Sequence, residues 1–371
     1  MIRKIALIVL LLFAIIPGTH VPVNGAIQEN SSLCTGIIKN NKLFIPLRSV
    51  FTDFGFSVDW NGNTNTVIIE KDSAKLTLVV EENRAAKKVM INQPILNNSR
   101  VYVPLRFASE SLGADVEWNS KARAAIVSYG GKKIYVYPKS REEITYYSGA
   151  YNINGKKISV NVVQIPLHAA VPDMVVAGGT VGNREELASM AKRSEAVVAI
   201  NGTFFNAYSN PPLPYGNIIK NGRIVHRGSV GTTCGFYVDG TAKFGHVEFR
   251  RLNDDLGDYG WEGIRTAVGA GPRLLTDGKI SVDPAGEGFT SKKILNMCMA
   301  RSAVGVKADG TVILVTTVAS IENLAQVMKN LGAHNAMNLD GGASSGLWYK
   351  GKYITPPGRL LSNSLVFTSM P

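Results

Sequence analysis

An internal repeat near the start of this 371-residue chain constrains its fold more than any other feature. Shifted by 58 residues, IPLRSVFTDFGFSVDWN (45–61) aligns with VPLRFASESLGADVEWN (103–119). Each unit predicts a strand, a short helix that begins at Pro-Leu-Arg and ends at a glycine, and then a strand pair across an Asn-rich turn. We expect the two units, about 33–70 and 91–129, to pack their tryptophan and leucine side chains into one small α+β core.

Both units carry the pattern Pro-Leu-Arg, then Gly, then Val-x-Trp, and in this they resemble the copper amine oxidase N-terminal domain family. The resemblance covers about residues 33–129 and implies attachment to the cell envelope or presentation of the next domain. A folded spacer without a ligand is the alternative. No copper site is carried over, because this span has no histidine and its one cysteine, Cys34, has no partner. We therefore take 26–137 as the first domain, with a boundary near Pro138.

The first 25 residues have the pattern of a secretory signal peptide. Arg3-Lys4 precedes an apolar run over 5–16 that is too short to span a bilayer comfortably, and Val23 and Gly25 suit cleavage after Gly25. A retained N-terminal anchor is the alternative. We expect a mature chain that is secreted or associated with the bacterial cell envelope, outside the cytoplasm and free of the membrane.

Charge and cysteine content narrow the possible partners. The formal net charge is +12, or +10 without the proposed signal peptide, and the basic residues are dispersed, so we expect no nucleic acid and favour an anionic envelope polymer. Three cysteines are too few for a disulfide framework, although a Cys234–Cys298 bridge stays open. Neither Cys-x-x-Cys nor His-x₃-His spacing occurs, so we expect no zinc and no cofactor; calcium in an oxygen-rich loop stays open.

Beyond residue 138 the chain alternates glycine-rich loops with apolar strands, expected at 158–165, 196–201, 311–318 and 363–369. Two helices are also expected. The first covers 183–193, with Asn183 as its N-cap, and the second begins at Ser320 and ends at Gly332. Because strands and loops predominate, 138–371 is predicted to be a larger, strand-rich α+β domain.

The stretch NLDGGASSGLW, residues 338–348, poses a choice between two chemistries. Its Gly-x-Ser-x-Gly fits the nucleophile elbow of a serine hydrolase, with Ser344 as nucleophile. That fold needs an acid and a histidine later in the chain, yet neither Asp, Glu nor His follows Ser344. Asp340 instead stands where a predicted strand runs into a Gly-Gly turn, whose amides can form an anion-binding nest. The alternative is an Asx-turn in which Asp340 only caps its own loop.

Other segments of the second domain add polar and glycine-rich loops that are each weak signals alone. They are Asn201-Gly202-Thr203-Phe204-Phe205, Gly269-Ala270-Gly271-Pro272, Arg301-Ser302-Ala303-Val304-Gly305 and Asn363-Ser364-Leu365. Together with 338–345, which lies between the third and the fourth of these segments, they resemble the phosphodiester glycosidase family. The resemblance spans about residues 150–370 and implies a hydrolase that cleaves a sugar-1-phosphodiester between the anomeric carbon and the phosphate oxygen.

The same resemblance implies roles for individual residues. Asp340 would be the base for water or would stabilise the oxocarbenium-like centre, and Arg301 would hold the phosphate. One carboxylate and one arginine suffice chemically, because the leaving phosphomonoester, with a second pKa of roughly 6, needs little protonation. The substrate-binding residues implied are Asn201, Gly202, Thr203, Phe204, Phe205, Gly271, Asn338, Gly341, Gly342, Ser344 and Ser345.

One departure from the family pattern keeps a second function open. Family members often have His-Pro before the arginine, where this chain has Met299-Ala300. A non-catalytic envelope glycan-binding protein that keeps a sugar-phosphate pocket is therefore the alternative to an enzyme.

Overall fold

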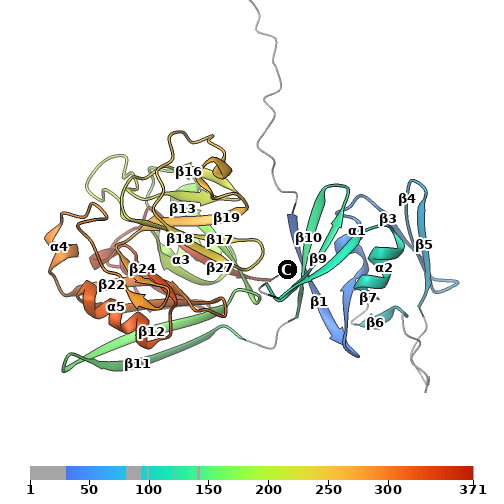
Figure 1. Cartoon of the computed structure of the whole chain (residues 1–371), viewed down its shortest axis with the longest axis horizontal. Helices are drawn as coiled ribbons and strands as arrows, with labels where there is room; N and C mark the ends of the chain where they lie inside the picture. Colours follow the sequence, from blue (N-terminus) through green and yellow to red (C-terminus); the bar gives the residue numbers. More distant parts are fainter. Residues whose placement is uncertain (1–30, 81–92, 98–99, 121, 140–142, 371) are drawn as a thin grey trace, which may run out of the picture.

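The computed structural model describes residues 31–80, 93–97, 100–120, 122–139 and 143–370 (Figure 1). The proposed signal peptide, residues 1–25, lies outside the described residues. The repeat units occupy the blue-to-teal part of Figure 1, and the larger strand-rich part follows from green to red.

Both repeat units have the predicted order of strand, short helix and hairpin. The first contains β1 (Ser31–Lys39), β2 (Lys42–Pro46), α1 (Leu47–Phe51), β3 (Ser57–Asn61), β4 (Thr66–Lys71) and β5 (Ala74–Val79). The second contains β6 (Ile95–Asn97), β7 (Arg100–Pro104), α2 (Leu105–Ser111), β8 (Asp115–Asn119) and β9 (Ala124–Tyr129), and β10 (Lys132–Pro138) follows it.

These strands form a seven-stranded sheet, ordered β6-β7-β2-β1-β10-β9-β8, and a three-stranded sheet of β3, β4 and β5. The predicted core is only partly right. Leu47 and Leu105 are buried, but Trp60 and Trp118 are 45% and 50% exposed. Each tryptophan is the next-to-last residue of its strand and lies opposite a buried residue of the neighbouring strand, Val67 or Ala125, so it stands at the edge of the core with about half of its surface in solvent.

Three sheets build the larger part, which is coloured from green to red in Figure 1. A seven-stranded sheet is ordered β11 (Thr145–Ile153), β12 (Lys156–Pro166), β23 (Thr311–Ala319), β22 (Met299–Val306), β24 (Asn335–Asn338), β20 (Arg273–Thr276) and β21 (Lys279–Ile280). A five-stranded sheet is ordered β13 (Ala170–Val176), β27 (Asn363–Ser369), β14 (Ala196–Asn201), β25 (Leu347–Tyr349) and β26 (Lys352–Thr355). A second five-stranded sheet is ordered β16 (Arg223–His226), β15 (Ile218–Lys220), β19 (Ile264–Ala270), β17 (Thr232–Tyr237) and β18 (Ala242–Gly245).

The helices of this part are short: α3 (Leu187–Arg193), α4 (Lys292–Leu295) and α5 (Ile321–Asn330), with the 3₁₀ turns η1 (Ala177–Gly179), η2 (Leu256–Tyr259) and η3 (Gly342–Ser344). The prediction of α5 is confirmed, because the Ser320 hydroxyl accepts from the Asn323 amide at 3.3 Å. The predicted start of α3 at Asn183 is wrong. Residues before Leu187 are drawn into extended backbone, because Glu185 pairs in a β-bridge with Leu361 and its carboxylate binds Arg193 at 2.8 Å.

One apolar core joins the three sheets of the larger part. It contains Ile165 of β12, Met174 of β13, Phe236 of β17, Val304 of β22 and Phe367 of β27, all at most 1% exposed. Strand β14 of one sheet and β24 of another end beside each other above this core, since the amide of Asp340 donates to the carbonyl of Gly202 at 3.1 Å. The loops that follow these two strands carry the predicted site.

Within the described residues, no helix has both the length and the apolar composition that a membrane span requires. Cys34, Cys234 and Cys298 are free thiols. The Cys234–Cys298 bridge therefore does not form here: Cys234 is fully buried in the core of the larger part, whereas Cys298 is exposed.

Candidate functional site

Asp340 is the carboxylate at the centre of the candidate site. It lies two residues after β24, and its side chain is 11% exposed. Burial raises its pKa from 3.8 to about 6, and hydrogen bonds from Ser344 and the Gly341 amide, together with the charge of Arg359, act in the opposite direction. A carboxyl group that exchanges its proton near neutral pH is suited to acid–base chemistry.

Asn201 holds together the segments around Asp340. Its side-chain amide donates to the Asp340 carbonyl at 2.7 Å, and its Oδ1 accepts from the Ser302 hydroxyl at 2.7 Å and from the Gly346 amide at 3.0 Å. Because all these atoms are engaged and Asn201 is 1% exposed, contact with a sugar would require some of these bonds to break. The Asn201 side chain therefore holds the backbone of Asp340 in place.

Thr203 and Asn363 form a second buried link. The Thr203 hydroxyl accepts from the Gly216 amide at 3.0 Å, and the Thr203 amide donates to Asn363 Oδ1 at 2.9 Å. A Cβ on Gly202 would lie only 2.0 Å from the same Asn363 oxygen, so the close approach requires glycine. The strand-end motifs 201–203 and 363–365 are thus one packed unit.

The turn after Asp340 is a single 3₁₀ turn, η3, followed by β25. The Gly341 amide donates to Asp340 Oδ1 at 2.8 Å; this bond comes from the next residue, whereas an Asx-turn needs the amide two residues on, so the predicted alternative of an Asx-turn at Asp340 is not what forms. A Cβ on Gly341 would stand 2.9 Å from the Ala300 carbonyl, so this position also requires glycine. Ser344 is fully buried and accepts a hydrogen bond from Arg359, and the segment lacks the strand-to-helix turn of a hydrolase elbow.

Arg301, the predicted phosphate ligand, lies in β22 and is only 1% exposed. Its Nη2 donates to the carbonyls of Lys293 and Met297 at 2.6 and 2.8 Å, and its Nε donates to the Ala319 carbonyl at 3.3 Å. Burial lowers the pKa of Arg301. In this arrangement the guanidinium fastens the loop that contains α4 to the end of β22.

Arg359 is the residue that sequence reasoning missed. Its Nη2 lies 4.0 Å from Asp340 Oδ2, its Nε donates to the Ser344 hydroxyl at 2.8 Å, and its Cζ lies 5.3 Å from the centre of the Phe205 ring. Its side chain is 30% exposed. One signal could have found it, because it is the only charged residue between 353 and 371.

Phe204 and Phe205, the two aromatic residues of the segment 201–205, lie in different environments. Phe205 is buried, and Arg359 covers one face of its ring. Phe204 is half-buried and contacts Phe289, with ring centres 5.8 Å apart. Phe204 is therefore the ring of the two that retains more accessible area for a ligand.

A second carboxylate missed by the sequence reasoning supports the Gly271 turn. Glu287 accepts from the Arg273 amide at 2.5 Å and from the Thr232 hydroxyl at 2.8 Å, and burial raises its pKa. Gly271 in turn exchanges hydrogen bonds with Asn338: its amide donates to the Asn338 carbonyl at 2.8 Å, and its carbonyl accepts from Asn338 Nδ2 at 2.7 Å. This turn therefore fixes the strand that leads to Asp340.

Two polar atoms in the motif 338–345 are buried without a hydrogen-bond partner among the described residues. They are Asn338 Oδ1 and Ser345 Oγ. Such an atom costs about 1–3 kcal/mol. The predicted residues of this motif are thus brought together, but their polar groups do not all face one accessible space.

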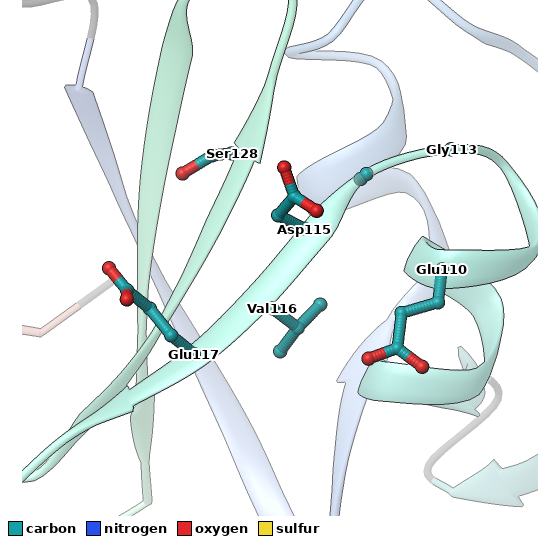
Figure 2. Close-up of a pocket in the computed structure, with 7 residues that line it drawn as sticks. Glu110, Gly113, Asp115, Val116, Glu117 and Ser128 are labelled. Atoms are coloured by element: carbon teal, nitrogen blue, oxygen red, sulfur yellow. The ribbon is translucent and has the colours of Figure 1, made fainter.

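A separate hollow lies on the second repeat unit (Figure 2). Figure 2 shows Glu110 on α2 and Asp115 and Glu117 on β8 around it. Glu110 is paired with the exposed Arg106 at 2.8 Å. The hollow contains none of the predicted site residues, and its acidic lining does not suit an anionic polymer. Among the described residues, no three His, Cys, Asp or Glu side chains are grouped so that they could hold a metal ion.

Comparison with known families agrees with this geometry. The phosphodiester glycosidase family model matches residues 194–368, and the copper amine oxidase N-terminal domain model matches residues 29–88 and 85–177. The first match contains Asn201, Arg301, Asp340 and Arg359.

Two curated relatives match part of the chain. The SPbeta prophage-derived uncharacterized protein YomE of Bacillus subtilis is 34% identical over 186 residues, which are 46% of this chain and 27% of that protein. The N-acetylglucosamine-1-phosphodiester alpha-N-acetylglucosaminidase of Mus musculus is 26% identical over 172 residues, which are 43% of this chain and 33% of that protein. The chain thus spans about a third or less of the length of these relatives.

Two solved structures share the fold. A hypothetical protein from Synechocystis has a TM-score of 0.53 at 15% identity, covering 92% of this chain and 99% of that one. The zebrafish N-acetylglucosamine-1-phosphodiester alpha-N-acetylglucosaminidase catalytic domain, auto-inhibited by its pro-peptide, has a TM-score of 0.51 at 21% identity, covering 69% of this chain and 88% of that one.

Proposed function

Because residues 194–368 belong to the phosphodiester glycosidase family, preceded by copper amine oxidase N-terminal domains, we propose that this chain hydrolyses a sugar-1-phosphodiester. The observation that carries the proposal is the Asp340 carboxyl group, buried at the junction of the family motifs with a pKa of about 6. N-acetylglucosamine is the first sugar to test, because the mouse relative's name specifies it.

In the proposed reaction, water attacks the anomeric carbon and the bond from that carbon to the phosphate oxygen breaks. The electron pair of that bond leaves with the phosphomonoester, whose second pKa is roughly 6, so the leaving oxygen needs no strong acid. Asp340, in its ionised form, accepts the proton of the attacking water or stabilises the positive charge at the anomeric carbon. In this proposal the half-buried ring of Phe204 packs against the sugar ring.

The test is hydrolysis of an N-acetylglucosamine-1-phosphodiester in ¹⁸O-labelled water. We expect the label in the released sugar and a loss of turnover of at least ~100-fold in Asp340→Asn. Asp277→Asn is the matched control, since that carboxylate is in the same domain and 75% exposed. Label in the phosphate product, or an Asp340→Asn variant as active as the wild type, would contradict the proposal.

The second candidate function is binding without turnover, and the Met299-Ala300 sequence favours it. Where family members often have histidine, the Met299 Cε lies 2.9 Å from the position that a Cβ on Gly342 would take. The neighbourhood of the Gly-Gly turn therefore has a thioether in place of a titratable ring. Tight binding of sugar-1-phosphodiesters by a wild-type protein that hydrolyses none of a panel would select this function.

We further propose that the protein works outside the cytoplasm, on glycans or anionic polymers of the envelope. The net charge of +10 after cleavage at residue 25 supports attraction to such polymers. Fractionation of expressing cells, with N-terminal sequencing of the mature chain, tests this directly. Recovery in the cytoplasm with residues 1–25 retained would contradict it.

A further inference from the structure

We propose that Arg359, and not Arg301, binds the phosphate group of the substrate, with Asp340 beside it. The inference deepens the proposed function and rests on it for the sugar part. The anion site itself can be tested without turnover.

Arg359 is held in place but not saturated. Ser344 and Phe205 fix two parts of the guanidinium: Nε donates to the serine hydroxyl, and the plane lies over the aromatic ring. Among the described residues, its Nη1 and Nη2 make no hydrogen bond, and Nη2 is still 4.0 Å from Asp340 Oδ2. A charge-assisted hydrogen bond is about 2.7–2.9 Å long, so this ion pair is not closed. Two terminal nitrogens of a planar guanidinium match two oxygens of a phosphate.

Arg301 is more enclosed and more fully bonded, with only Nη1 making no hydrogen bond among the described residues. It is 1% exposed, against 30% for the side chain of Arg359, and three of its donor bonds go to backbone carbonyls. Binding of a phosphate by two nitrogens of Arg301 would require Nη2 or Nε to give up its bonds to the carbonyls of Lys293, Met297 or Ala319. Its geometry is that of a positioning residue, which holds this loop next to the site.

The position of Arg359 lets its guanidinium interact with both the Asp340 carboxylate and a bound phosphate. Its charge opposes that of Asp340 in the free protein, since it lowers the carboxyl pKa that burial raises. A phosphate that takes the two terminal nitrogens would compete with Asp340 for that charge and would be repelled by the ionised carboxylate. Neutralising Asp340 should therefore strengthen phosphate binding, which is a prediction specific to this pairing.

The experiment measures binding of inorganic phosphate to the full protein by calorimetry at pH 7.5, for the wild type, Arg359→Ala, Arg359→Lys and Asp340→Asn. We expect at least ~10-fold weaker binding in Arg359→Ala, partial recovery in Arg359→Lys, and several-fold tighter binding in Asp340→Asn. Arg223→Ala is the matched control, because Arg223 is an exposed arginine on β16 of the same domain. Circular dichroism and thermal unfolding establish that each variant is folded.

Three binding results overturn the inference. If Arg359→Ala binds phosphate as tightly as the wild type, Arg359 is not the phosphate ligand. If Asp340→Asn binds phosphate with unchanged affinity, Asp340 does not compete with phosphate for Arg359. A wild type that binds no phosphate at ~50 mM also overturns it. If phosphate binding depends on Arg359 but no sugar-1-phosphodiester is cleaved, the anion site stands and the proposed function fails. If a sugar-1-phosphodiester is cleaved and Arg359→Ala cleaves it as fast as the wild type, the proposed function stands and the role of Arg359 fails.

Discussion

Replacing Asp340 by asparagine should stabilise the protein at alkaline pH while removing the proposed hydrolytic activity. The folded-state pKa of about 6 lies above the ordinary value of 3.8, so folding disfavours the ionised carboxylate. The carboxyl group is neutral in both states well below pH 4, and the destabilisation develops between about pH 4 and 6, where the unfolded chain has lost the proton and the folded protein still holds it. At about 1.4 kcal/mol per pH unit, the gap between 3.8 and about 6 corresponds to about 3 kcal/mol at pH 8.

Urea unfolding of the wild type and Asp340→Asn at pH 4 and pH 8, followed by tryptophan fluorescence, measures this difference. We expect the two proteins to differ in free energy of unfolding by less than about 1 kcal/mol at pH 4 and by about 3 kcal/mol, in favour of the variant, at pH 8. The amide keeps an oxygen for the Gly341 amide, so the local turn is preserved. An equal difference at both pH values, or a variant less stable at pH 8, would refute the argument from burial.

Three further substitutions test the packing around the site and the repeat domain. Arg301→Ala should lower the free energy of unfolding by about 3–5 kcal/mol, because three backbone carbonyls lose a buried donor; urea unfolding that matches the wild type would show that they find other partners. Gly341→Ala should cost about 1–3 kcal/mol and reduce turnover, since the new methyl group would lie 2.9 Å from the Ala300 carbonyl; unchanged melting temperature and rate would contradict this contact. Trp118→Ala should change the free energy of unfolding by less than about 1 kcal/mol because Trp118 is half exposed, whereas Leu105→Ala should lower it by about 2–5 kcal/mol because Leu105 is buried. Equal effects of the two substitutions in thermal unfolding would contradict this difference in burial.

Much of the fold follows from local patterns in the sequence. The repeat predicts both strand–helix–hairpin units, and the capped segment 320–332 predicts α5, because these signals act within a few residues. The exposure of Trp60 and Trp118 and the late start of α3 did not follow. Both depend on contacts with distant segments, such as the bridge between Glu185 and Leu361, that local propensity does not contain.

The candidate site divides in the same way. The motifs around Asn201 and Asp340 are recognisable in sequence, and the structure brings them into contact through one amide side chain. Which arginine lies beside the carboxylate is not recognisable, because Arg301 and Arg359 differ only in what surrounds them. Three-dimensional packing encloses Arg301 among carbonyls and leaves Arg359 partly open.

Strand β27 has a consequence for the timing of assembly. It lies inside its sheet, between β13 and β14, and Asn363 at its start secures the turn at Gly202 and Thr203. The ribosome makes the chain from its N-terminus, so strands made roughly 160 to 190 residues earlier have to wait for their central neighbour. The two sheets of the repeat units are built from β1 to β10, so their strands can pair before β27 is made. The site therefore forms only after residue 369 has been made, and a chain that stalls before this point has no assembled site.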